Sequence, residues 1–455
     1  MLSSRDHYKG GKLLKIVIIG GVAAGMSAAA KAKRSCVDAS IIVIEQGQDV
    51  AYGACGLPYF VGGYNNDIEL MRIRGVEDFR KAGIDVRLGE EVLAVETARK
   101  TLTVSSAAGQ YEESYDKLLI ATGAGAVIPT VEGVEAAGVF VLKTLVDGAN
   151  LKAAIDKECV QNVVIVGGGY IGIEVAEAMA AKRKNVFIVE AADRILSGFD
   201  AEITAIATQE LQQHGVSIHT GESLKKIQTS EGRVYCVETS KGIYPADAVV
   251  LALGVRPRTQ FLAGSGISLA DNGAVVIDRQ MRSNVPDIYA AGDCATVYHE
   301  LLEKQVYIPL GTNANKQGRL AGENICGGNR EMPGVLGTAS VKIMDLEAVK
   351  TGLTEQEAKR NGIDVKTVFV EAPSHAPYYP NPTPIHIKLV YSKDSGILLG
   401  AQLIGRQGVV LRGHVLATCI HARMTISQIG WLDFSYAPPF AMPWDAVHVA
   451  ANAAK

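Results

Sequence analysis

Two glycine-rich turns, each lying between an apolar strand and a helix, constrain this chain more than any other feature. The clearer turn follows a predicted strand over 163–166 and reads Gly167-Gly168-Gly169-Tyr170-Ile171-Gly172, a complete G-x-G-x-x-G pattern before a predicted helix over 173–182. The next predicted strand, 186–189, leads to Glu190. In such a βαβ unit the helix N-terminus binds a pyrophosphate and the acid accepts a hydrogen bond from a ribose. We therefore predict that Gly167, Gly169, Gly172 and Glu190 bind a dinucleotide.

The same order occurs once earlier in the chain. A strand over 15–19 leads into Gly20-Gly21-Val22-Ala23-Ala24-Gly25, a helix is predicted over 26–34, and a strand over 41–44 leads to Glu45. Val22 stands at the second glycine position, where a side chain is expected to restrict the approach of a pyrophosphate. Gly20, Val22, Gly25 and Glu45 therefore predict a second dinucleotide site, and the duplication predicts an α/β protein.

Two further strand ends carry small or acidic residues. A strand over 117–120 leads to Thr122 and Gly123, and an apolar strand beginning at Ile288 delivers Asp293 directly after Gly292. A carboxylate at a strand end suits a ribitol or ribose hydroxyl. An equally good interpretation is that Asp293 caps a following helix. A helix is also predicted over 145–155.

Composition excludes several classes of protein. The chain has 455 residues, of which 48% are hydrophobic and 20% are charged, so it is long and apolar enough for two to four domains. Its net charge of -3 comes without a basic stripe, which argues against nucleic acid and membrane surfaces as partners. No apolar run reaches the roughly 18 residues that span a bilayer. Residues 1–15 lack the apolar region of a signal peptide and are interpreted as a loose leader.

Seven scattered cysteines form no C-x-x-C pair, which favours a reducing, cytoplasmic location. One of them, Cys55, stands in the segment Ala51-Tyr52-Gly53-Ala54-Cys55-Gly56-Leu57-Pro58-Tyr59-Phe60, just before a possible helix. A thiol at a helix N-terminus is expected to have a lowered pKa and a raised reactivity. Cys55 is therefore the candidate redox centre, and a buried structural cysteine is the alternative.

The order of these motifs resembles the flavin-dependent pyridine nucleotide disulfide oxidoreductases over nearly the whole chain. The resemblance implies FAD on the first fingerprint and NAD(P)H on the second, in two Rossmann-like domains followed by an α+β dimerisation domain. The implied limits are 1–145 and 265–334 for the FAD-binding domain, 146–264 for the NAD(P)H-binding domain and 335–455 for the dimerisation domain of a homodimer. Glu190 favours NADH over NADPH because it would repel a 2′-phosphate, and the nearby Arg194 softens that preference.

Around Cys55 the sequence resembles one branch of this family more than the others. Many family members carry a second redox cysteine five residues before the first, and here that position is Val50. NADH oxidases and peroxidases of the single-cysteine branch carry a histidine at the position of Ala23. The segment around Cys55 is similar instead to coenzyme A disulfide reductases, although Ala51 replaces a common serine. This implies reduction of coenzyme A disulfide, with coenzyme A as substrate or as a mixed disulfide on Cys55.

Three other functions stay open. They are an NADH oxidase that cycles Cys55 through a sulfenic acid, an NAD(P)H-dependent persulfide or polysulfide reductase, and, from a different class, a redox-linked flavoprotein that binds a partner or transfers electrons to it.

In coenzyme A disulfide reductases two tyrosines reach the redox cysteine from the partner subunit. Tyr436 matches one of them, and either Tyr378 or Tyr379 matches the other. A phenol is a plausible proton donor to the departing thiolate. Among the basic residues, Arg34 and Arg72 are the expected contacts to the phosphates of coenzyme A, since guanidinium groups suit phosphates. The histidines show no metal-ligand spacing, and no metal is expected.

Overall fold

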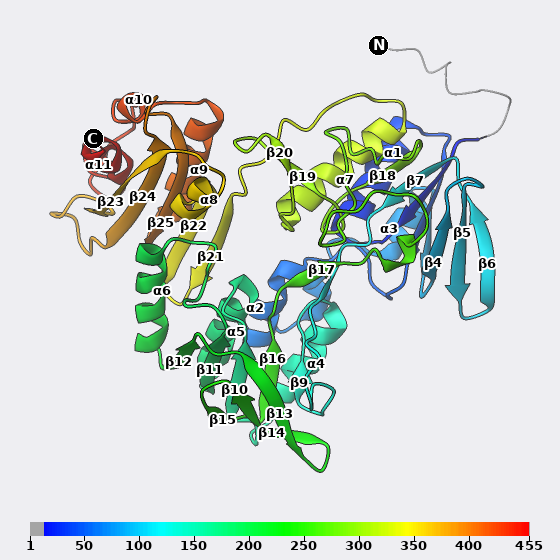
Figure 1. The fold of residues 1–455 in the computed structure, drawn as a ribbon, viewed down its shortest axis with the longest axis horizontal. Coiled ribbons are helices and arrows are strands. Elements are labelled where there is room, and N and C mark those ends of the chain that lie inside the picture. Colours follow the sequence, from blue (N-terminus) through cyan, green and yellow to red (C-terminus); the bar gives the residue numbers. More distant parts are fainter. Residues whose placement is uncertain (1–12, 455) are drawn as a thin grey trace.

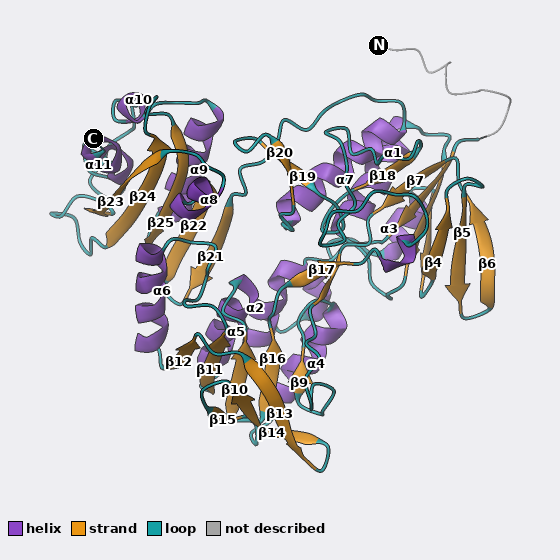
Figure 2. Ribbon diagram, viewed as in Figure 1, coloured by secondary structure: helices purple, strands orange, loops and turns teal. Residues whose placement is uncertain are grey.

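The structure is a computed structural model that describes residues 13–454. Most of the expected leader, residues 1–12, lies outside this range. Figures 1 and 2 show three parts. The first part is built from two segments of the chain, and the residues between these segments form the second, inserted part. The C-terminal residues form the third part. Within the described range, no helix combines the length and the apolar character needed to cross a membrane.

The first part contains a parallel sheet in the order β18-β7-β1-β2-β3. In β1 (Lys15–Ile19) the four residues after Lys15 are all buried, as expected for a strand covered on both faces. The other elements before the insertion are α1 (Ala23–Ser35), β2 (Ser40–Glu45), η1 (Ala54–Gly56), α2 (Leu57–Gly62), η2 (Ile68–Met71), α3 (Val76–Lys81), β3 (Ile84–Leu88), the antiparallel β4 (Glu91–Glu96), β5 (Thr101–Ser106) and β6 (Gly109–Ser114), then β7 (Lys117–Ile120) and β8 (Ala124–Ala126). Those after it are η3 (Gln260–Leu262), β18 (Ile288–Ala290), β19 (Val297–His299), β20 (Lys304–Val306) and α7 (Gly311–Ile325).

The inserted part has its own parallel sheet, in the order β12-β11-β10-β16-β9. Its elements are β9 (Val139–Phe140), α4 (Leu145–Ile155), β10 (Asn162–Val166), α5 (Tyr170–Ala181), β11 (Asn185–Glu190), α6 (Ala201–Gln213), β12 (Val216–Thr220), β13 (Leu224–Ser230), β14 (Arg233–Thr239), β15 (Ile243–Pro245) and β16 (Ala248–Leu251). The helix predicted over 145–155 is found with the same limits. Because β9 pairs with β16, this sheet begins before residue 146, the expected start of the domain. The chain enters the inserted part after β8 and leaves it at β17 (Val255–Pro257), and these two short strands pair antiparallel.

The C-terminal part is an antiparallel sheet in the order β21-β22-β25-β24-β23 with helices packed against it. Its elements are β21 (Ala339–Ile343), β22 (Leu346–Gly352), α8 (Glu355–Arg360), β23 (Val365–Pro373), β24 (Pro384–Ser392), β25 (Leu398–Gly405), α9 (Val409–His421), α10 (Ile426–Ile429) and α11 (Ala446–Ala453). The expected α/β class with an α+β C-terminal domain is confirmed.

A buried lysine fastens the C-terminal part to the inserted part. Lys388 on β24 is only 3% exposed, and its ammonium group donates to Glu202 of α6 at 2.9 Å and to Glu355 of α8 at 2.8 Å. Asp200, at the start of α6, lies 3.2 Å away. Burial would lower the pKa of Lys388, but these carboxylates outweigh burial and raise it above its ordinary value. The lysine therefore stays charged, and removing it would leave the buried carboxylate of Asp200 without its cation.

Helices α1 and α7 pack against each other with almost no space between their backbones. A Cβ on Gly318 would lie 2.2 Å from the carbonyl oxygen of Ala24, and a Cβ on Gly322 would lie 2.4 Å from that of Ala28. Only glycine permits this approach. The packing brings the second half of the first part, which carries α7, onto the helix of the first glycine turn.

Candidate functional site

Both glycine turns have nearly the same geometry. Gly20 and Gly167 have φ of 103° and 111°, and a Cβ on either would lie 2.3 Å from a carbonyl oxygen of the neighbouring strand end. A Cβ on Gly25 would lie 1.8 Å from the carbonyl oxygen of Gly20, and Gly172 meets Gly167 in the same way at 2.0 Å. These contacts fix each helix at the carboxyl end of its strand. The helices begin three residues earlier than predicted, at Ala23 and Tyr170, because their first turns lie inside the glycine patterns.

The two predicted acids lie where the βαβ pattern requires them. Glu45 accepts hydrogen bonds from the backbone N–H groups of Gly21 at 2.6 Å and Gly47 at 2.7 Å. Glu190 accepts from those of Gly168 and Ala192, both at 2.7 Å. Each carboxylate is thus held against its glycine turn, as a ribose-binding acid must be.

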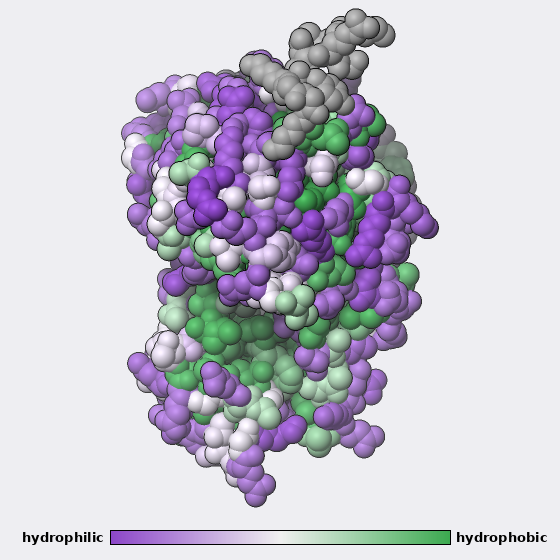
Figure 3. All heavy atoms as spheres, turned by 90° about the vertical axis from the view of Figure 1, so that its right-hand side faces the viewer, coloured by the Kyte–Doolittle hydropathy of each residue, from purple (hydrophilic) through white to green (hydrophobic). Residues whose placement is uncertain are grey.

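The second glycine position differs between the turns. No atom other than its chain neighbours lies within 4 Å of a Cβ built on Gly169, so backbone there is open to a pyrophosphate. Val22 takes this position in the first turn, where it is the N-cap of α1 and is partly exposed. Figure 3 shows hydrophobic surface in the hollowed middle of one face, between the upper and lower parts of the molecule. Both turns carry the acid and the close glycine contacts that fit a dinucleotide, and the second turn also has open backbone at Gly169.

The other predicted cofactor residues gather at the first turn. The backbone of Thr122 lies 3.2 Å from a Cβ built on Gly20, and its hydroxyl donates to the Arg258 carbonyl at 2.7 Å. A Cβ built on Gly292, which has φ of 84°, would lie 2.9 Å from the Cβ of Ala24 in the first turn of α1, and Asp293 is the next residue. The next element after Asp293 is strand β19, so the interpretation of Asp293 as a helix cap is wrong.

Cys55 lies where the first part meets the inserted part. It stands in η1, and a Cβ on Gly311, the first residue of α7, would lie 3.8 Å from its Sγ. The helix that follows, α2, packs against α4 and α5 of the inserted part and shares their hydrophobic core. The thiol itself stays accessible to solvent.

The expected lowering of the Cys55 pKa is wrong. Loss of solvation raises the pKa of the thiol above its ordinary value, the carboxylate of Glu174 raises it further, and the ammonium group of Lys143 opposes them. Lys143 pairs with Asp293 at 3.2 Å, which also weakens its effect. The short helix α2 has six residues and begins after Cys55, so its dipole does not outweigh these groups.

No second cysteine accompanies Cys55. Val50, at the position of the second redox cysteine, is buried, and its side chain contacts the first glycine turn. Among the described cysteines only Cys159 is also exposed, and it follows α4 in the inserted part; the other five are buried. A disulfide formed by Cys55 in this chain therefore requires a sulfur from another molecule.

Sequence reasoning missed one acid near the thiol. Glu174 on α5 has a pKa raised to about 7 by burial, against the opposing hydrogen bond from the Tyr59 hydroxyl at 3.4 Å. Burial and Glu174 raise the pKa of Tyr59 to about 12. The position of Glu174, two residues after the last glycine of the second turn, was the only available signal.

The C-terminal tyrosines form a pair. The hydroxyls of Tyr378 and Tyr436 hydrogen-bond to each other, and this contact raises the pKa of Tyr436. Tyr379 packs instead on the edge of the His375 ring, with centroids 5.4 Å apart. The three tyrosines are 72%, 43% and 42% exposed in sequence order, and the β23–β24 loop lies at the outer edge of the C-terminal part, away from α2 (Figure 1). Within one chain they do not reach Cys55.

The two predicted arginines differ in position. Arg72 lies beside the Cys55 segment, since Tyr52 and Arg72 form a backbone bridge, but its guanidinium already pairs with Asp49 at 2.7 Å and with Glu69. Arg34 is exposed in the last turn of α1, at the opposite end of that helix from the glycine turn. The structure therefore brings Arg72 to the site and leaves Arg34 distant from it.

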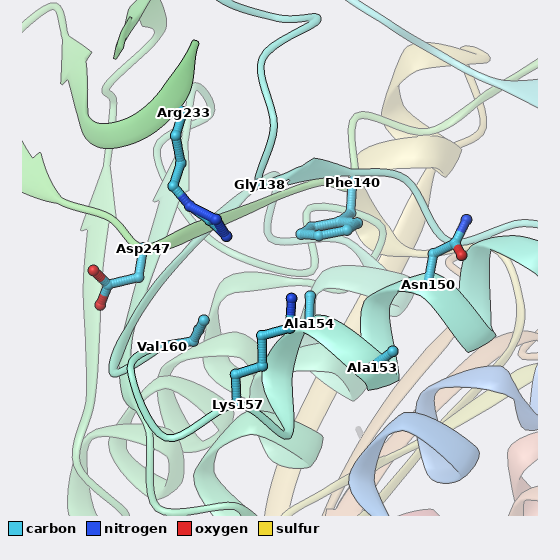
Figure 4. A pocket seen from close by; sticks show the side chains of 9 residues that line it. All are labelled: Gly138, Phe140, Asn150, Ala153, Ala154, Lys157, Val160, Arg233 and Asp247. Carbon is cyan, nitrogen blue, oxygen red and sulfur yellow. The ribbon is translucent and has the colours of Figure 1, made fainter. Parts of the chain in front are cut away.

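Two other features lie apart from this site. A hollow of about 240 Å³ is lined by Phe140, Lys157 and Arg233 at the amino ends of β10 and β16, whereas Gly167 follows the carboxyl end of β10 (Figure 4). Glu210, His214 and Asp345 are close enough to hold a metal ion, but Arg406 pairs with both carboxylates at 3.1 Å.

Comparison with known proteins agrees with this geometry. The family described as pyridine nucleotide-disulphide oxidoreductase matches residues 14–318, and its dimerisation domain matches residues 338–446. A Pyrococcus horikoshii protein named NAD(P)H coenzyme A polysulfide/persulfide reductase is 39% identical over 97% of this chain and 98% of its own. The structure of an NAD-dependent persulfide reductase from A. fulgidus has a TM-score of 0.93 at 37% identity, over 96% of this chain and 82% of its own.

A more distant relative performs another reaction. The water-forming NADH oxidase from Lactobacillus brevis, whose structure holds NADH, also has a TM-score of 0.93, at 30% identity over 97% of this chain and 98% of its own. The paired glycine turns, the cysteine between them and the matched profiles lead to one conclusion: this chain is an enzyme of the pyridine nucleotide-disulfide oxidoreductase family.

Proposed function

We propose that this enzyme uses NADH to reduce coenzyme A disulfide, or a related persulfide or polysulfide, through FAD and the single redox cysteine Cys55. The observation that carries the proposal is an accessible thiol at the N-terminus of α7 with no second cysteine beside it. Such a thiol must form its disulfide with the substrate. The names of the Pyrococcus horikoshii and A. fulgidus proteins support coenzyme A and persulfide sulfur as candidates.

The proposed roles rest on the order of the two turns in this family and on the residues gathered at each turn. The first turn, with Glu45, Thr122, Gly123 and Asp293, holds FAD, and the second turn, with Glu190, holds NADH. Bound in the first turn, FAD would supply the two electrons for sulfur reduction, which NADH would provide as a hydride. The Cys55 thiolate attacks one sulfur of the disulfide and displaces the other as a thiolate, and two electrons then release the second thiol. In total, one disulfide, NADH and a proton give two thiols and NAD⁺.

Each departing thiolate needs a proton donor. We propose that Tyr436 of the partner subunit donates it, with Tyr378 as its hydrogen-bond partner, because both hydroxyls are solvent-exposed in one chain and form a pair. A homodimer that places this pair at Cys55 of the neighbouring subunit would complete each site. Arg72, beside the Cys55 segment, is the better-placed of the two expected phosphate contacts.

An NADH oxidase is the second candidate, since the Lactobacillus brevis enzyme shares the fold. Ala23, at the first residue of α1, argues against it because its methyl group cannot supply a proton to a leaving hydroxide. The scattered cysteines, which form no C-x-x-C pair, support a cytoplasmic location.

A first prediction concerns Cys55. Cys55→Ser should bind FAD and accept hydride from NADH normally, since neither step uses sulfur, but should lose coenzyme A disulfide reduction by a factor on the order of 10³ or more. The measurement is anaerobic stopped-flow reduction with NADH, followed by mixing with coenzyme A disulfide. Cys159→Ser, which removes the other exposed thiol, should behave as wild type. Rapid reoxidation of the Cys55→Ser flavin by the disulfide would mean that another group relays the electrons.

A second prediction concerns the nicotinamide. NADH should give a higher kcat/KM than NADPH, because the Glu190 carboxylate would lie at the ribose of the bound nucleotide and would repel a 2′-phosphate. Glu190→Ala should lower the ratio of kcat/KM for NADH to kcat/KM for NADPH by roughly tenfold or more. The control Glu158→Ala, at an exposed position, should leave this ratio unchanged. Equal kcat/KM for both nucleotides in the wild-type enzyme would contradict the assignment.

A third prediction concerns the dimer. Tyr436→Phe should leave reduction by NADH intact and slow disulfide turnover by about 100-fold, while Tyr235→Phe, another exposed tyrosine, should have no effect. A heterodimer of Tyr436→Phe and Cys55→Ser subunits should recover one functional site, since one combination keeps both groups. A purified heterodimer without recovered turnover would show that the tyrosine does not act across the interface.

A further inference from the structure

Two cysteines meet where helices α1 and α7 end side by side, at the opposite ends of these helices from the nucleotide turn and Cys55. Cys36 is the C-cap of α1 and Cys326 is the C-cap of α7, and each is 8% exposed. The Cys36 Sγ lies 3.8 Å from the carbonyl oxygen of Cys326. The Cys326 Sγ lies 3.5 Å from the carbonyl oxygen of Ala32, which also accepts the Cys36 N–H at 2.8 Å. Both sulfurs therefore occupy one small space between the helix ends.

The two side chains also contact each other directly. A hydrogen bond between the thiols, together with burial, raises the pKa of Cys326 well above its ordinary value, against the opposing charge of Lys31. Cys326 is therefore a neutral thiol while the helix ends stay closed, and its oxidation requires local opening of these ends. Nothing in the reaction at Cys55 uses either sulfur.

We propose that Cys36 and Cys326 form a second redox site that closes to an intramolecular disulfide when hydrogen peroxide oxidises it. Peroxide transfers one oxygen to the first sulfur to give a sulfenic acid, and one water leaves. The second thiol then attacks this sulfur, the S–S bond forms, and the hydroxyl departs as a second water. Two thiols and one peroxide thus give one disulfide and two waters, with two electrons passing from sulfur to oxygen.

The choice of oxidant follows from burial. We expect a small neutral peroxide to reach this buried pair when the helix ends open locally, and we expect a bulky disulfide such as coenzyme A disulfide to be excluded. The pair therefore responds to peroxide and not to the proposed substrate of Cys55, and the proposal does not depend on that substrate.

The consequence concerns cofactor retention. α1 begins at the first glycine turn, and α7 begins beside Cys55. A bond between the other ends of these helices closes a loop from residue 36 to residue 326 and restricts the unfolded chain. The oxidised protein should therefore hold its flavin to a higher temperature.

The test uses the flavin-loaded enzyme, reduced with dithiothreitol, desalted and incubated with hydrogen peroxide. Remaining thiols are blocked with N-ethylmaleimide, and peptides are analysed by mass spectrometry without reduction. We expect a peptide in which Cys36 is linked to Cys326, which dithiothreitol separates, and no such peptide after incubation with coenzyme A disulfide. It should be absent from Cys36→Ser and Cys326→Ser and present in Cys419→Ser, which removes a different buried thiol.

Flavin fluorescence during heating gives the second readout. The linked protein should release flavin at a temperature higher by roughly 2 °C or more, and dithiothreitol should abolish the difference. The wild-type experiment alone decides the proposal if a variant fails to fold. The proposal would be overturned if peroxide fully oxidises Cys55 while Cys36 and Cys326 stay reduced or are over-oxidised separately. It would also be overturned if coenzyme A disulfide forms the Cys36–Cys326 disulfide equally well.

Discussion

The geometry of both glycine turns depends on backbone contacts that only glycine permits. At each turn the third glycine of the pattern lies so close to the first that a methyl group would overlap a carbonyl oxygen, at 1.8 Å for Gly25 and 2.0 Å for Gly172. These contacts place two helix N-termini, each with unpaired N–H groups, at the carboxyl ends of strands in two parallel sheets. Glu45 and Glu190 then complete each turn from the neighbouring strand.

Cys55 links these two units in space as well as in sequence. Its short segment follows the first nucleotide unit in the chain, but α2 packs on α4 and α5 of the second, while α7 returns from the far side of the insertion to meet the sulfur. The close packing of α7 on α1 through Gly318 fixes this return. Three segments that are distant in sequence thus meet around Cys55, at the junction of the first part and the inserted part.

Local patterns predicted the parts of the structure that local physics determines. The strand-turn-helix-strand order, the positions of Glu45 and Glu190 and the limits of α4 could all be found in the sequence, because each depends on a few consecutive residues. The Cys55 pKa could not, since it depends on burial in the folded chain and on the charge of Glu174, which lies on α5 of the inserted part. The pairing of Tyr378, and not Tyr379, with Tyr436 depends on the tertiary fold and had no signal in the sequence. The contact between Cys36 and Cys326, 290 residues apart, had no sequence signal.

The central claim is that Cys55 carries the sulfur of the substrate as a mixed disulfide. Mass spectrometry of the Cys55 peptide from enzyme isolated without reductant, before and after anaerobic addition of NADH, tests it most directly. The account predicts a coenzyme A adduct on Cys55, or a persulfide if that is the substrate, which NADH removes to leave a thiol. A sulfenic acid on Cys55 would support the oxidase instead, and a Cys55 that stays an unmodified thiol after incubation with excess coenzyme A disulfide or persulfide would contradict the account.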